Sequence, residues 1–87
     1  MKKDVLLVLI SNRKKEAEKV QKILTGWGCL IKTRLGLHAG TLENCSDSGL
    51  LFLELVGKEE NHRELSRKLD LLPGVNAKLV ELEVEDE

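Results

Sequence analysis

The sequence predicts an α+β fold, a βαββαβ sandwich in which one antiparallel four-stranded sheet carries two helices on one face. Three observations predict it. Two short apolar runs, at 5–10 and 50–56, have the length and the branched residues of central strands. Apolar residues at helical spacing follow each run, and residues that alternate between apolar and polar follow each helical stretch. The 87 residues fit a single domain spanning 1–87.

The first half of the chain is predicted to form a strand, a helix and a strand. Val5–Ile10 is continuously apolar, and the following Ser11-Asn12 supplies side chains that cap helices. A helical stripe comes next, ended by glycines at 26 and 28; its members are Ala17, Val20, Ile23, Leu24 and Trp27. We interpret Trp27 as a core residue. Residues 29–37 alternate, with Ile31, Thr33 and Leu35 on one side and Lys32 and Arg34 on the other.

The second half repeats this pattern after a predicted loop at 38–48. The strand at 50–56 is interrupted only by Glu54. The second helix carries a stripe of Leu65, Leu69 and Leu72, and Pro73-Gly74 ends it. The last strand begins at Val75, and its alternation slips after Leu79, which predicts a bulge near Val80 and Glu81. An acidic tail occupies about 83–87.

Right-handed crossovers place both helices of such a chain on one face of the sheet. The two central strands are apolar on both sides, so the uncovered face would expose a sizeable apolar patch. Patches of this kind commonly mark interfaces, and small domains commonly gain stability by association. We therefore expect a homo-oligomer, a dimer or a tetramer.

The composition excludes several classes of protein. The net charge is −1, from 14 basic and 15 acidic side chains, and only two aromatic residues are present, so we expect no direct nucleic-acid binding. The first apolar run is too short to cross a membrane, and the residues after it do not resemble a signal-peptide cleavage site. Two cysteines do not make a disulfide framework. A cytoplasmic protein is the simplest interpretation.

Short motifs along nearly the whole chain give it a family resemblance. They are Ser11-Asn12-Arg13, Lys19–Leu24, Arg34–Leu37 and Leu72–Val75. With these motifs the chain resembles the iron-only hydrogenase system regulators, small stand-alone ACT-like domains related to the carboxy-terminal domain of nickel-responsive repressors. The resemblance implies a ferredoxin-like fold, oligomerisation through the sheet and a ligand-responsive, transcriptional type of regulation. The segment Glu43–Asp47 departs from the family pattern.

The start of the first helix breaks an electrostatic rule. A helix amino terminus carries a partial positive charge and favours acidic residues, yet Arg13, Lys14 and Lys15 stand there. Backbone N–H groups and cations together suit an anion. In ACT-like domains the corresponding loop commonly binds effectors, and the end of the second strand could complete such a pocket. The candidate effector or anion site is Ser11, Asn12, Arg13, Lys14, Arg34 and Gly36; the alternative is that the cations are simply solvated.

A metal site is a weaker hypothesis, and no cofactor is expected. Its best candidates, His38 and Cys45, lie seven positions apart, and they could share a metal only with ligands from a partner chain. We interpret Cys29 as a small buried residue and His62 as an exposed helical residue.

Catalysis is not expected. The chain lacks both phosphate-binding glycine motifs, and Cys45 with His38 is the only nearby pairing of nucleophile and base. The sequence therefore favours a small regulatory domain that oligomerises through its sheet and binds a small effector. The alternative is a structural subunit that binds no small molecule and acts through an unknown protein partner.

Overall fold

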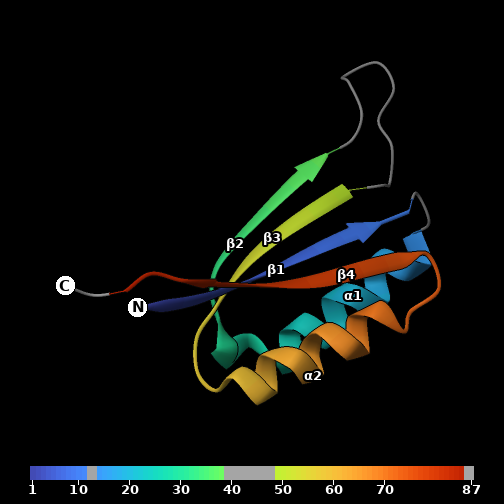
Figure 1. The fold of residues 1–87 in the computed structure, drawn as a ribbon. Coiled ribbons are helices and arrows are strands. Elements are labelled where there is room, and N and C mark those ends of the chain that lie inside the picture. The colour runs from blue at the N-terminus through green and yellow to red at the C-terminus, as the bar shows by residue number, and fades with distance from the viewer. Residues whose placement is uncertain (12–13, 39–48, 86–87) are drawn as a thin grey trace.

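The computed structural model describes residues 1–11, 14–38 and 49–85, which form one sheet with two helices on one of its faces (Figure 1). The elements in chain order are β1 (Lys2–Ile10), α1 (Lys14–Gly26), a 3₁₀ turn η1 (Gly28–Leu30), β2 (Ile31–His38), β3 (Gly49–Leu55), α2 (Glu59–Asp70) and β4 (Val75–Glu83). The strand order is β2-β3-β1-β4, and every neighbouring pair is antiparallel. The predicted ferredoxin-like, ACT-like fold is confirmed. The predicted loop beyond His38 and the capping residue Asn12 lie outside the described residues.

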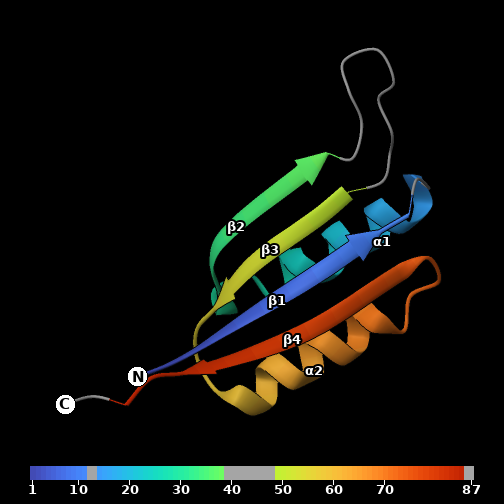
Figure 2. The same cartoon turned by 45° about the horizontal axis from the view of Figure 1, so that its top comes forward.

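The core lies between the sheet and the helices, which lie behind the strands in Figure 2. Strand periodicity selects its members, because alternate residues of β1 and of β3 point to the helices. The fully buried side chains are Leu6, Val8, Val20, Leu53, Leu65 and Leu69. Trp27 is half-buried and packs against this cluster, as predicted.

Two strand details differ from the prediction. The pairing of β1 with β4 is regular from Lys2↔Glu83 to Ile10↔Val75, so the predicted bulge near Val80 and Glu81 is wrong. The alternation slips because the side of β4 that contacts the helices becomes polar where the strand extends beyond the core. Glu81 lies on this side, and its Oε1 atom is 3.5 Å from Arg63 Nε on α2.

The irregularity lies in β2 instead, where the register with β3 shifts between Ile31 and Thr33. This shift turns Ile31 toward the core, against which it packs, whereas Leu35 is exposed opposite Phe52. The prediction that Ile31, Thr33 and Leu35 share one side is therefore wrong for Ile31.

The face of the sheet away from the helices, here called the open face, is largely apolar. Leu9 and Leu35 on this face are 55% and 54% exposed, and Leu82 is 53% exposed. Glu54 is a polar exception: it accepts a hydrogen bond from Thr33 Oγ1 at 2.8 Å and pairs with Lys3 Nζ at 2.7 Å. The expected apolar patch is confirmed for the described residues.

Candidate functional site

A pocket of about 360 Å³ lies where β1 ends, beside the turn that joins α2 to β4. It is lined by Leu9, Ile10, Ser11, Gly74, Val75 and Asn76, and it is called the Ser11 pocket below. Its walls are mostly apolar, and Ser11 and Asn76 are its polar residues.

The close approach of Ser11 to Gly74 shapes this pocket. The Ser11 amide donates to the Gly74 carbonyl oxygen at 2.9 Å. Gly74 has φ 73°, and a Cβ atom at this position would lie 2.5 Å from Ser11 Oγ. Glycine is therefore required both by the left-handed backbone and by the space. The Pro73-Gly74 pair that ends the helix in the sequence thus also builds the pocket.

The Ser11 hydroxyl is the unusual group of the pocket. Its Oγ atom is buried and has no hydrogen-bond partner among the residues that the structure describes. Burying a hydroxyl without a partner costs about 1–3 kcal/mol. A ligand that supplied the missing hydrogen bond would recover that energy.

The structure brings only part of the predicted effector site into view. Asn12 and Arg13 lie outside the described residues, and Lys14 is the first residue of α1. Arg34 and Gly36 lie on β2, and β3 stands between β2 and β1, the strand that Ser11 follows. Within the chain, Ser11 thus lies beside Gly74 and Asn76 rather than beside Arg34 and Gly36.

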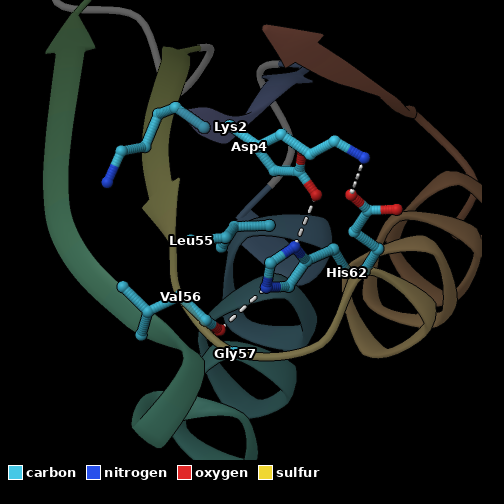
Figure 3. A pocket seen from close by; sticks show the side chains of 8 residues that line it. Lys2, Asp4, Leu55, Val56, Gly57 and His62 are labelled. Carbon is cyan, nitrogen blue, oxygen red and sulfur yellow. Dashed lines mark hydrogen bonds and ion pairs between the residues drawn. The ribbon is translucent and has the colours of Figure 1, made fainter. Parts of the chain in front are cut away.

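A second, polar pocket of about 230 Å³ lies at the opposite end of β1 (Figure 3). It is lined by Lys2, Lys3, Asp4, Leu55, Val56, Gly57, Glu59 and His62, and it is called the His62 pocket below. The prediction that His62 is exposed is wrong, because its side chain is 4% exposed. Its Nδ1 lies 2.6 Å from Asp4 Oδ2, and its Nε2 lies 2.7 Å from the Val56 carbonyl oxygen.

The rim of the His62 pocket is charged. Lys2 Nζ lies 3.4 Å from Glu59 Oε1, and both side chains are largely exposed. The Glu59 carboxylate, helped by the charge of Glu83, raises the pKa of Lys2 above its ordinary value. Arg63 pairs with the other Glu59 oxygen at 3.3 Å within α2, and the Lys2–Glu59 pair joins α2 to β1.

The sequence contained a signal for this site that residue-type reasoning missed. Asp4 precedes Leu6 and Val8 with the strand period of two, and this places it on the core-facing side. His62 precedes Leu65 by three and Leu69 by seven, so it continues the leucine stripe of α2. Periodicity alone therefore predicts both residues as buried.

The metal hypothesis gains no ligand set. Among residues 1–11, 14–38 and 49–85, no three His, Cys, Asp or Glu side chains are grouped to hold a metal ion. Cys29 is exposed, so its interpretation as a buried residue is wrong. It follows the end of α1 in the 3₁₀ turn, outside the helical stripe. Cys45 lies outside the described residues.

No helix of the described residues is long and apolar enough to cross a membrane.

Comparison with known proteins identifies the fold. No protein-family model and no curated protein match the chain. An uncharacterized protein from Thermotoga maritima matches with a TM-score of 0.80 and 26% identity, over 95% of this chain and 100% of that one. The ACT domain of GTP pyrophosphokinase from Chlorobium tepidum matches with a TM-score of 0.62 and 11% identity, over 92% and 97% of the two chains. A PII-like signaling protein from Thermus thermophilus matches with a TM-score of 0.58 and 12% identity, over 94% and 88%. The chain therefore shares the fold of ACT domains and PII-like proteins.

Proposed function

We propose that the chain is a small, non-enzymatic regulatory domain that binds a small effector in the Ser11 pocket and associates with itself through the open face. The observation that carries the proposal is the buried Ser11 hydroxyl, which has no partner among the described residues and stands beside a pocket of about 360 Å³. A buried polar group without a partner calls for an explanation, and the one proposed here is a bound effector.

The pocket's chemistry defines the effector class. Ser11 and Asn76 offer hydrogen bonds, and Leu9 and Val75 offer apolar contact. In sequence the pocket adjoins Arg13 and Lys14, whose charges favour an anionic group. We therefore expect a small molecule with a carboxylate or a phosphate and a short apolar part, such as an amino acid.

The fold and the open face support the regulatory part of the proposal. Two of its structural neighbours are named as an ACT domain and a PII-like signaling protein. We expect an effector to act by changing association, either between copies or with a partner, since a ligand shifts an equilibrium when it binds one state more tightly than the other. The resemblance to the iron-only hydrogenase system regulators supports a cytoplasmic role in that system.

One feature favours a second candidate function, that of an interaction subunit without an effector. The open face exposes apolar side chains from β1, β2 and β4, and such a surface can bind a protein partner with no help from a ligand. The two candidates differ in their response to small molecules, which only the regulatory domain requires.

Thermal unfolding with a panel of amino acids, organic acids, nucleotides and metal ions tests the proposal. An effector at 100 times its Kd stabilises the native state by about 2.7 kcal/mol, which raises Tm clearly in a domain of this size. Ser11→Ala should weaken that effector's binding at least tenfold. Ser66→Ala, which removes a hydroxyl from α2 outside the pocket, should leave it unchanged. No response to any member of the panel would favour the interaction subunit.

A further inference from the structure

His62 is enclosed between two hydrogen-bond acceptors at the end of β1 opposite the Ser11 pocket (Figure 3). Its ring nitrogens lie 2.6 Å from the Asp4 carboxylate and 2.7 Å from the Val56 carbonyl oxygen. The side chains of His62 and Asp4 are 4% and 5% exposed, so water has little access to the contact between them. Buried polar groups of this kind are ordinarily hydrogen-bonded within the protein.

The two contacts of the His62 ring can be hydrogen bonds only if enough of the atoms involved carry hydrogens. A carbonyl oxygen only accepts, so His62 Nε2 must carry a hydrogen. The contact between Nδ1 and Asp4 Oδ2 is a hydrogen bond only if one of these atoms carries a proton. With a hydrogen on each ring nitrogen, both contacts are hydrogen bonds, and the pair is an imidazolium beside a carboxylate.

Loss of that proton would break the arrangement. A neutral ring that keeps its bond to Val56 would turn a lone pair toward the Asp4 carboxylate at 2.6 Å. Two acceptors that face each other form no hydrogen bond, and the buried carboxylate then has no donor from the ring.

Other charged groups lie around the pair on β1, α2 and β4. They are Lys2, Glu59, Arg63, Glu81 and Glu83. Lys2 and Arg63 both pair with Glu59, and Arg63 also lies 3.5 Å from Glu81. The Lys3 side chain pairs with Glu54 on the open face. The ring of His62 itself contacts Asp4 and Val56.

The two contacts of His62 join β1, the residue after β3, and α2. Asp4 belongs to β1, Val56 follows β3, and His62 lies in the first turns of α2. We propose that the Asp4–His62 pair is a proton-dependent contact that holds the start of α2 on the sheet, so that a rise in pH releases this end of the helix. This device is independent of an effector in the Ser11 pocket.

Nitrogen-15 NMR of the full chain gives the first test. A His38→Gln background leaves His62 as the only histidine ring. At neutral pH both ring nitrogens of His62 should carry directly bonded hydrogens. One nitrogen of the lone-pair type in the native protein would overturn the proposal.

Hydrogen exchange of the Asn61 and His62 amides, which donate to the Lys58 carbonyl oxygen, gives the second test. After correction for intrinsic exchange, their protection should fall by up to tenfold per pH unit as the ring loses its proton. In Asp4→Asn the amide donates to Nδ1 of a neutral ring, so protection should vary less than twofold over the same range. Glu64→Gln, which removes an exposed carboxylate of α2, should keep the wild-type slope. The same slope in Asp4→Asn and the wild type would overturn the proposal.

Discussion

The contact between Gly74 and Ser11 gives the sharpest prediction, because its energy can be worked out from two features of the structure. Gly74→Ala places alanine at φ 73°, in the left-handed region, which costs about 1–2 kcal/mol. The new methyl group would lie 2.5 Å from Ser11 Oγ and 3.3 Å from Glu16 Cγ. Displacing a packed side chain costs about 1–3 kcal/mol more.

The expected loss is therefore about 3 kcal/mol, a large share of the roughly 4–13 kcal/mol that stabilises a domain of 87 residues. Urea unfolding should report this loss as a lower midpoint, and thermal unfolding as a drop in Tm of about 10–20 °C. Gly26→Ala is the matched control: its methyl group meets no atom within 4 Å, and the residue ends a helix. We expect its Tm to equal or exceed that of the wild type.

A double-mutant cycle separates the two costs. Ser11→Ala removes the Oγ atom that the new methyl group would meet, and this atom is a buried hydroxyl without a described partner, so the change alone should be neutral or stabilising. In the Ser11→Ala background, Gly74→Ala should cost only the backbone term of about 1–2 kcal/mol. An equal cost in both backgrounds would refute the contact as the cause.

Three further predictions concern the core, the open face and the sheet's polar contact. Leu65→Ala should lose about 2–5 kcal/mol in urea unfolding, whereas Leu71→Ala, 68% exposed, should change stability by less than about 0.5 kcal/mol. Leu35→Asp should convert the expected oligomer to a monomer by light scattering, and an unchanged mass would exclude the open face as its interface. The Lys3 ammonium holds the pKa of Glu54 below its ordinary value of 4.5. Ionised Glu54 therefore contributes stability above about pH 4.5 that is lost as the pH falls through the lowered pKa, and Glu54→Gln should flatten this part of the Tm profile.

The sequence was sufficient for the fold because strands and helices carry local periodic patterns. The continuous apolar run of β1 and the leucine stripe of α2 can each be recognised from a few neighbouring residues. The register shift at Ile31 could not be predicted in this way, because it depends on how β2 pairs with β3. The apolar residues at the end of β4 were likewise consistent with a bulge until the pairing with β1 was known.

The sites were harder to predict than the fold for the same reason. Ser11 was identified from its place after the first strand. Its hydrogen-bond partner Gly74 is distant in sequence and was interpreted only as the end of a helix. His62 was interpreted by residue type as exposed, and its partner Asp4 is 58 positions away. Polar residues in a small core depend on such distant partners, which no local pattern specifies.

The central position of β1 has a consequence for how the chain folds. β1 pairs with β3 on one side and with β4 on the other, and the β4 ladder joins Lys2 to Glu83, almost the whole chain apart. Contacts between residues far apart in sequence slow folding, because the chain between them loses conformational entropy before the contacts form. Until β4 docks, one edge of the apolar β1 stays unpaired, and an unpaired apolar edge promotes aggregation. During synthesis, the arrival of the last strand is therefore the step that protects the first.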